Sequence, residues 1–170
     1  MIISLQDFEK YNLNVNWKVI YIGWNSNFIF KKQLKAKEII NFAISKLNIE
    51  NENILKLAAC CENEEDAISN YLSLLAEEEV SSYSISLKKW EVIFVIKKLP
   101  PKNINFIEGL LALGEIWIEL NFPNNCPHIF QGQGNFFSPI NYYTYENFIF
   151  LYNKHIEWIK ENLDYLSTKE

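Results

Sequence analysis

Apolar residues recur at intervals of three and four along most of the chain, the spacing that places them on one face of an α-helix. The clearest stripe follows Asn63 and consists of Ala67, Ile68, Tyr71, Leu72, Leu75 and Ala76. Asn63 is the expected N-cap of this helix. Its first turn holds three acids, which complement the helix dipole there: Glu64, Glu65 and Asp66.

The same spacing predicts further helices along the chain. One is capped by Ser4 and ends near Lys10, and others span 37–47, 53–61 and 106–120. A final helix begins after Thr144, a plausible N-cap. Its apolar face consists of Phe148, Leu151, Tyr152, His155, Ile159, Leu163 and Leu166. Because His155 lies on this face, we expect it to be a core histidine that makes one hydrogen bond.

Two segments fit a helix and a strand equally well. Residues 15–30 contain apolar residues at alternating positions, as in a strand, and also at helical spacing. Residues 90–96 are rich in β-branched residues, as in a buried strand, but the lysine pairs at both ends also fit a buried helix. We therefore predict an all-α array of about six helices in a single globular domain over 1–170. The alternative is an α+β fold with strands near 15–30 and 90–96.

Residues 121–145 contain no Asp, Glu, Lys or Arg, although 22% of the chain is charged. Pro123, Pro127 and Pro139 lack a backbone donor, and Gly132 and Gly134 interrupt regular structure, so little helix or strand is expected here. Disordered segments are poor in aromatics, whereas this one holds Phe122, Phe130, Phe136, Phe137, Tyr142, Tyr143 and Tyr145. We predict a long, ordered aromatic loop before the last helix, which either packs on its own domain or binds a partner.

The net charge of −5 is unevenly distributed. Residues 50–79 contain nine acids and one base, Lys56, so this block carries −8 and the rest of the chain +3. An acidic surface repels nucleic acid and anionic membranes, and it attracts a basic protein. All 16 basic residues are lysine, which removes the bidentate guanine and phosphate contacts of arginine. We expect neither a nucleic-acid nor a membrane partner.

The candidates for metal binding and catalysis are few. Adjacent Cys60 and Cys61 would point about 100° apart on a helix, which does not suit one zinc ion. Cys126 and His128 could form a nucleophile and a base, but no third group that orients them is evident. We therefore predict no metal and no other cofactor.

Nothing after Met1 resembles a signal peptide, and so we expect a cytoplasmic protein with reduced thiols.

Several motifs resemble those of a family of small bacterial proteins of unknown function. A Trp-led apolar helix precedes a second helix that ends in aromatic-x-Leu-Asn-Phe-Pro, and a Tyr-Tyr-Thr-x-Glu entry leads to the last helix. The residues that carry this resemblance are Trp17, Gly23, Trp24, Trp90, Trp117, Phe122, Pro123, Tyr142, Tyr143, Thr144 and Glu146. Small acidic bacterial proteins of this kind are similar to immunity proteins, which neutralise a toxin by binding it. The resemblance implies an all-helical fold and a protein partner.

These observations lead us to expect a cytoplasmic immunity or antitoxin factor whose partner is a basic toxin domain. Its expected contact residues are acids that steer association and aromatics that anchor it: Glu62, Glu64, Glu65, Asp66, Glu77, Glu78, Phe130, Phe136, Phe137 and Tyr142. One alternative is a small enzyme that uses Cys126, His128 or Glu146 in or beside the loop. Another is an oligomeric adaptor or scaffold whose uncharged loop docks onto a second copy.

Overall fold

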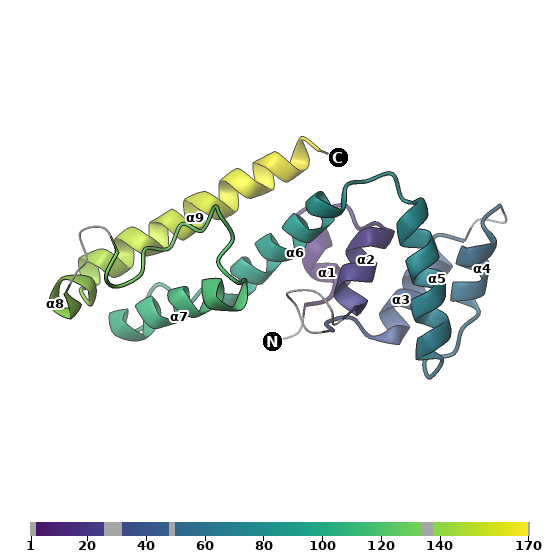
Figure 1. Ribbon diagram of the computed structural model, residues 1–170, viewed down its shortest axis with the longest axis horizontal. Helices are drawn as coiled ribbons and strands as arrows, with labels where there is room; N and C mark the ends of the chain where they lie inside the picture. Colours follow the sequence, from purple (N-terminus) through teal and green to yellow (C-terminus); the bar gives the residue numbers. More distant parts are fainter. Residues whose placement is uncertain (1–2, 26–31, 48–49, 134–137, 170) are drawn as a thin grey trace. The chain divides into compact units, whose positions relative to one another are not determined.

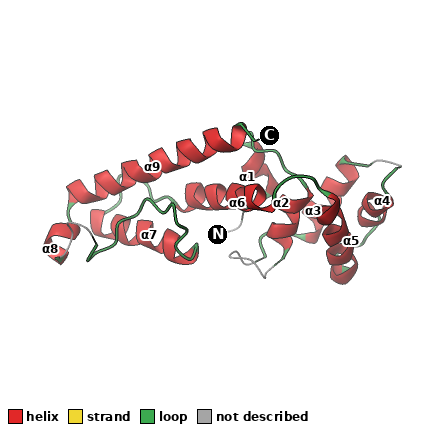
Figure 2. Ribbon diagram, turned by 45° about the horizontal axis from the view of Figure 1, so that its top comes forward, coloured by secondary structure: helices red, strands yellow, loops and turns green. Residues whose placement is uncertain are grey.

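A computed structural model describes residues 3–25, 32–47, 50–133 and 138–169. All regular structure in these ranges is helical (Figures 1 and 2): α1 Leu5–Glu9, α2 Trp17–Trp24, α3 Ala36–Ser45, α4 Glu52–Ala58, α5 Glu65–Glu78, α6 Tyr83–Lys98, α7 Phe106–Glu119, α8 Pro139–Tyr142 and α9 Tyr145–Ser167. The predicted all-α class is confirmed. The alternative strands are not found, since α2 and α6 occupy the described parts of both ambiguous segments.

The chain divides into two compact units, with the boundary between Ile93 and Phe94. The first unit contains α1 to α5 and most of α6, and the second contains the end of α6 together with α7, α8 and α9. Each unit is described separately below. The expectation of a single domain stays a prediction.

In the first unit, α2 packs on α5, and α4 packs on both α3 and α5. The side chains that fill this core are fully buried, among them Val19, Ile20, Ile22, Ile39, Leu57, Ile68 and Leu72. Trp90 of α6 is also fully buried, and its indole N–H donates to the carbonyl of Val19 at 2.8 Å. Its ring meets Phe8 of α1 edge to face at 4.8 Å between centroids. Trp90 therefore connects three helices of this unit.

Capping and burial explain why the two ambiguous segments are helical. Asn16 caps α2, because its side chain accepts a hydrogen bond from the Val19 backbone N–H at 2.9 Å. Residues 89–95 of α6 are buried without a break, so this part of the helix is buried on all sides and shows no amphipathic period. The one ammonium in that run belongs to Lys89, which donates to the carbonyl of Asn14 at 2.7 Å.

In the second unit, α7 packs against α9. Both helices contribute buried residues to this core: Leu110, Leu113, Ile116, Trp117 and Leu120 from α7 and its C-cap, and Phe148, Leu151, His155, Trp158, Ile159 and Leu166 from α9. Gly109 lets the helices approach closely, because a Cβ there would lie 2.4 Å from a ring carbon of Phe148. The two apolar stripes predicted from sequence therefore face each other.

Several predicted helix boundaries are confirmed and two details are corrected. Ser4 and Thr144 are the N-caps of α1 and α9, as expected. The N-cap of α5 is Glu64 rather than Asn63. The loop before α9 contains the four-residue helix α8, which begins at Pro139, where a missing backbone donor is tolerated. Among the described helices, none combines the length and the apolar character needed to cross a membrane.

Candidate protein-binding surface

The acids predicted to bind a partner lie at the two ends of α5 or just before it. Glu64 is the N-cap, Glu65 and Asp66 are in the first turn, and Glu77 and Glu78 are in the last turn. About 18 Å of helix separates the two groups, since an α-helix rises 1.5 Å per residue. They therefore form two acidic clusters rather than one.

Three of these acids also make bonds within the fold. Glu64 accepts the Cys61 backbone N–H at 2.6 Å, and Glu65 pairs with the Lys32 ammonium at 2.9 Å. Glu78 accepts hydrogen bonds from the side chains of Asn51 and Asn53, at 3.1 and 3.2 Å, and so holds α4 near the end of α5. All three carboxylates help to support the first unit.

The remaining predicted acids are more available to a partner. Glu62, Asp66 and Glu77 are all exposed. Neither Glu62 nor Asp66 forms an ion pair or hydrogen bond with another described residue, and Glu77 only accepts a 3.5 Å bond from Ser73. These three carboxylates are the better candidates for steering a basic partner.

The predicted aromatic anchors lie in the second unit. Phe130 is half-buried, and its ring meets His128 at 4.5 Å and Phe122 at 5.3 Å between centroids. Tyr142 is only 4% exposed, so it offers little surface to a partner in this fold. The predicted contacts of Phe136 and Phe137 lie outside the described residues. The structure therefore places the acids in one unit and the described aromatics in the other.

Helix α7 carries a second apolar stripe, on the side turned away from its buried face. Ile107, Leu111 and Ile118 are 43%, 51% and 56% exposed. Their spacing of four and seven residues places them on one side of the helix. Phe122 and Ile140, which are 52% and 85% exposed, add further apolar area from the loop. We call these five residues the α7 surface.

The α7 surface borders several hollows in the second unit. One, of about 390 Å³, is lined by Ile107, Leu111, Pro139, Ile140 and Tyr143. Another, of about 280 Å³, is lined on one side by residues of α7 and on the other by residues of the loop, His128 and Phe130 among them. Shallow apolar hollows beside exposed apolar side chains can receive the side chains of another protein.

The backbone holds Phe122 in an unfavourable conformation. After α7 the chain turns through Asn121 and Phe122, whose φ angles are 55° and 52°. This left-handed region costs a bulky residue about 1–3 kcal/mol. The Phe122 N–H donates to the carbonyl of Trp117 at 2.9 Å, which closes the turn. The surrounding structure thus keeps an aromatic ring half-exposed at the end of the α7 surface.

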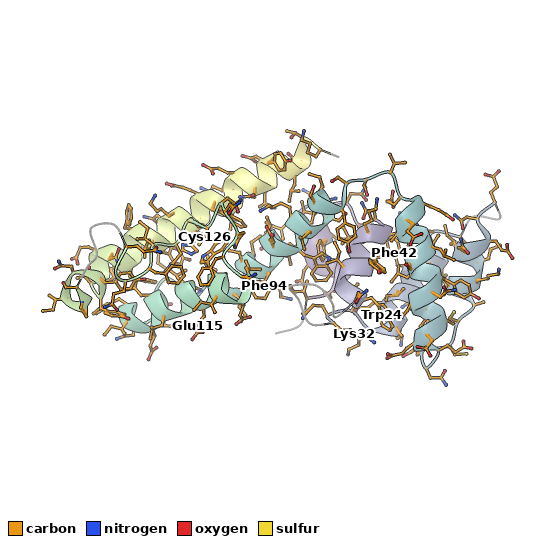
Figure 3. All side chains as sticks on the ribbon, viewed as in Figure 1. Trp24, Lys32, Phe42, Phe94, Glu115 and Cys126 are labelled. Carbon is orange, nitrogen blue, oxygen red and sulfur yellow. The ribbon has the colours of Figure 1, made fainter. Side chains whose placement is uncertain are left out.

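The segment that carries the α7 surface contains acids but no base. Residues 103–153 contain no lysine or arginine and four acids, all of them exposed: Glu108, Glu115, Glu119 and Glu146. Glu119 forms an ion pair with Lys98. Glu108 and Glu115 lie beside the apolar stripe on α7, and Glu115 projects from the helix in Figure 3. The surface therefore combines exposed apolar side chains with negative charge.

Two buried histidines hold the loop and α9 in place. His155 is fully buried, accepts the Trp117 indole N–H at its Nε2 and lies 2.6 Å from the Leu151 carbonyl at its Nδ1. It makes two hydrogen bonds, one more than the sequence led us to expect. The Nε2 of His128 lies 3.0 Å from the Tyr142 hydroxyl. Asn147 donates to the Tyr142 carbonyl at 2.8 Å.

Burial also determines the protonation of these groups. It lowers the pKa of His155 to about 4. Burial, with a smaller effect of nearby His155, lowers the pKa of His128 to about 3. Burial raises the pKa of the Tyr142 hydroxyl to about 12. All three side chains are therefore neutral at pH 7, and they act as hydrogen-bonding groups of the core.

The same arrangement offers little to a catalytic pair of Cys126 and His128. A general base works best with a pKa near the working pH, and that of His128 is far below it. Burial raises the pKa of the Cys126 thiol, which keeps it protonated. The sulfur lies 3.8 Å from the His128 carbonyl oxygen. Among the described residues, no three His, Cys, Asp or Glu side chains are placed to share a metal ion.

Ile107, Leu111, Ile118 and Ile140 were not among the residues predicted to bind a partner. The sequence pattern predicted one apolar face for α7, the one that packs on α9. The signal that could have revealed the others was the second set of apolar residues on α7, which lies beside Glu108 and Glu115 within a stretch, residues 103–153, that contains no base. Sequence alone could not show that this face is left uncovered by the described residues.

Comparison with known proteins places the chain in a family. Residues 5–163 match the family model described as an uncharacterized protein conserved in bacteria (DUF2247), and the chain therefore belongs to this family. No curated protein and no solved structure matches the chain.

Proposed function

For this member of an uncharacterised bacterial family, we propose a role as an immunity-type inhibitor that neutralises a basic toxin domain by direct binding. The toxin would contact the α7 surface with a segment that combines apolar side chains with lysine or arginine. The observation that carries this proposal is the exposed apolar stripe of Ile107, Leu111 and Ile118 in a segment, residues 103–153, that contains acids but no lysine or arginine.

The apolar part of the α7 surface argues for a macromolecular partner. Exposed apolar residues scattered singly are ordinary, but a contiguous group rimmed by polar residues is typical of a protein contact. Leu111 lines two of the neighbouring hollows, so a partner side chain placed beside it would lose contact with water on several sides. Buried anchors of this kind carry most of the binding energy at an interface.

The charge of the surface argues for a basic partner. Glu108 and Glu115 would lie at the contact, and lysine or arginine opposite them would form charge-assisted hydrogen bonds. In the first unit, exposed Glu62, Asp66 and Glu77 add to the negative field that attracts such a partner from a distance. A nucleic acid or an anionic membrane would be repelled by the same field. The inhibitor would act in the cytoplasm, where it would protect the cell that makes the toxin.

A second copy of the chain is a weaker candidate for the partner. In a two-fold dimer, the same patch meets itself, so Glu108 and Glu115 of one copy would come near those of the other. No lysine or arginine between residues 103 and 153 could compensate this repulsion. Charge complementarity therefore favours a different, basic protein over the adaptor or scaffold alternative.

Coexpression with the product of the neighbouring gene tests the proposal. We expect the two proteins to copurify as a stable complex, and we expect this chain to restore growth of cells that express the neighbour alone and stop growing. Sedimentation of the purified chain at low and high concentration should show no self-association. A neighbour that neither binds the chain nor impairs growth would contradict the immunity role, and a concentration-dependent dimer would support the scaffold alternative instead.

A further inference from the structure

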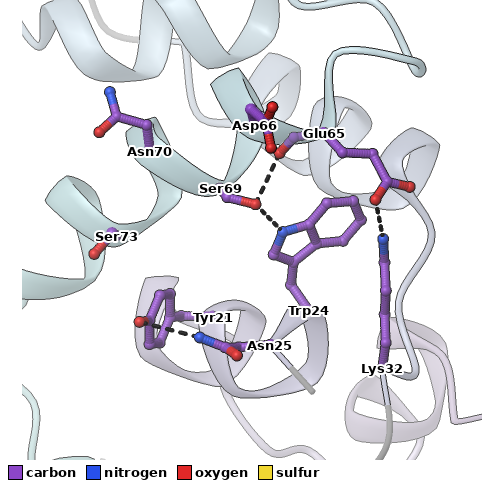
Figure 4. A pocket seen from close by; sticks show the side chains of 9 residues that line it. All are labelled: Tyr21, Trp24, Asn25, Lys32, Glu65, Asp66, Ser69, Asn70 and Ser73. Carbon is purple, nitrogen blue, oxygen red and sulfur yellow. Dashed lines mark hydrogen bonds and ion pairs between the residues drawn. The ribbon is translucent and has the colours of Figure 1, made fainter. Parts of the chain in front are cut away.

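The first unit contains a polar hollow of about 470 Å³ between α2 and α5 (Figure 4). Its volume lies in the range of small-molecule sites. The lining residues are mostly polar: Tyr21, Trp24, Asn25, Lys32, Glu65, Asp66, Ser69, Asn70 and Ser73. None of them belongs to the α7 surface, so this hollow is a separate candidate site.

One side of the hollow already holds a cation. The Lys32 ammonium lies 3.4 Å from the centre of the Trp24 ring and 2.9 Å from a Glu65 carboxylate oxygen. The ring is fixed in turn, because its indole N–H donates to Ser69 Oγ at 2.7 Å, and Ser69 donates to the Glu65 carbonyl at 2.7 Å. Figure 4 shows these bonds around Trp24. The indole face and the carboxylate together bind this positive charge.

The rest of the hollow offers further acceptors that Lys32 does not use. Asp66, Asn70 and Ser73 are spaced by four and three residues, so they lie on one face of α5. Neither Asp66 nor Asn70 has a partner among the described residues, and the charge of Asp66 is therefore uncompensated there. Lys32 neutralises Glu65, so the hollow as a whole carries one negative charge.

We propose that this hollow binds the guanidinium group of an arginine side chain, with Asp66 as the charged acceptor. A guanidinium presents five N–H donors in a planar fork, whereas an ammonium presents three donors around a point charge. Asp66 and Asn70 lie about one turn apart on α5, so the Asp66 carboxylate and the Asn70 amide oxygen can accept from two edges of such a fork. The chain contains no arginine of its own that could fill the site.

An arginine side chain of another protein can reach the hollow, because it opens at the surface where Asp66 and Asn70 are exposed. The hollow shares no residue with the α7 surface, so this proposal would also stand if the α7 surface had a different role.

The probe for this site is N-acetyl-arginine amide, which carries the side chain between neutral backbone groups. We expect it to shift the indole NMR signal of Trp24 in a saturable way, with the signal assigned from the Trp24→Phe variant. Asp66→Asn should weaken binding about tenfold or more, since it removes a charge-assisted hydrogen bond. Asn70→Ala should weaken it less. Glu9→Gln, which removes an exposed charge outside the hollow, should leave the affinity unchanged.

Three ligands complete the test. N-acetyl-citrulline amide has nearly the same shape without the charge, and N-acetyl-lysine amide has the charge without the planar fork, so both should bind more weakly. Free arginine that binds more tightly than the amide would assign the site to the free amino acid, and equal or weaker binding would assign it to a protein side chain. The proposal is wrong if citrulline or lysine binds as well as arginine, if Asp66→Asn has no effect, or if no saturable shift occurs. A failure here with an intact toxin complex would leave the proposed function standing.

Discussion

Trp117 donates its indole N–H to Nε2 of His155 at 2.6 Å, and both side chains are fully buried. Because an indole nitrogen can only donate, His155 must accept at Nε2 and carry its proton on Nδ1, which donates to the Leu151 carbonyl. The bond joins α7 to α9 and fixes which side of α7 is buried. The opposite side, with Leu111 and Ile118, is thereby presented outward.

Replacing Trp117 by Phe should destabilise the protein by about 2–4 kcal/mol, because it leaves the buried acceptor of His155 unpaired and opens space in the core. Urea unfolding at pH 7 measures this change. Trp17→Phe is the control, since Trp17 is half-exposed and should cost less than about 1 kcal/mol. Equal losses in the two variants would contradict the importance assigned to the Trp117–His155 bond.

The protein should lose stability as the pH falls from 7 to 5. His128 and His155 have pKa values of about 3 and 4 in the folded protein and an ordinary value of 6.5 when unfolded. In this window the unfolded chain binds protons that the folded protein does not, so acid favours unfolding. Each histidine should contribute a loss of about 2 kcal/mol between pH 7 and pH 5.

The variant His128→Gln tests this assignment, because glutamine can bond to Tyr142 without titrating. Its free energy of unfolding should fall by about 2 kcal/mol less than that of the wild type over the same pH range. Carboxylates titrate in both proteins and cancel in the comparison. Identical pH dependence in the two proteins would show that His128 is not buried in its neutral form.

The variant Gly23→Ala should destabilise the first unit although alanine favours a helix by about 0.5–1 kcal/mol over glycine. The added Cβ would lie 2.2 Å from Cζ2 of Trp90 and 2.9 Å from Cδ1 of Leu34. Trp90 is fully buried and bonded to Val19, so it cannot move away without cost. We expect a loss of about 1–3 kcal/mol in thermal or urea unfolding. A gain in stability would mean that the Trp90 ring does not pack against Gly23.

Steering by the first unit should depend on Glu62 and Glu77 rather than on Glu64 and Glu65, which bond within the fold. The double variant Glu62→Lys with Glu77→Lys should slow association with the toxin several-fold at low salt and much less at high salt. The dissociation rate should change little. Stopped-flow kinetics at several salt concentrations measure both rates, and an unchanged association rate at low salt would remove the steering claim.

Most of the fold could be predicted from the sequence where helices have one apolar face and a polar one. α9 is the clearest case, since Phe148, Leu151, His155 and Leu166 all proved buried and Thr144 caps the helix as expected. α6 could not be assigned because residues 89–95 are buried on every side, which erases the periodic signal. The four-residue helix α8 depends on a Ser138 cap and on Pro139, and so brief a helix leaves no periodicity to detect.

The candidate site was harder to predict than the fold. Charge alone identified the acids, but sequence could not distinguish Glu64, which bonds to the Cys61 backbone, from exposed and unbonded Asp66. Tyr142 was expected to anchor a partner, yet its hydroxyl bonds to His128 inside the unit. Leu111 and Ile118 looked like ordinary helix residues until packing showed which face of α7 the second unit covers. The exposure of a side chain depends on contacts between residues that are far apart in the sequence, and a local sequence pattern does not show these contacts.

The most direct test of the account is the affinity of the toxin domain for this chain and for two variants, measured by calorimetry. Leu111 is 51% exposed on the α7 surface, and Val80 is 98% exposed in the first unit, so an aspartate at either position should be tolerated by the fold. Leu111→Asp should weaken binding about 30-fold or more and abolish growth rescue, because it places a charge among apolar contacts. Val80→Asp should bind within about twofold of the wild type. A Leu111→Asp variant that binds and protects as well as the wild type would contradict the central claim.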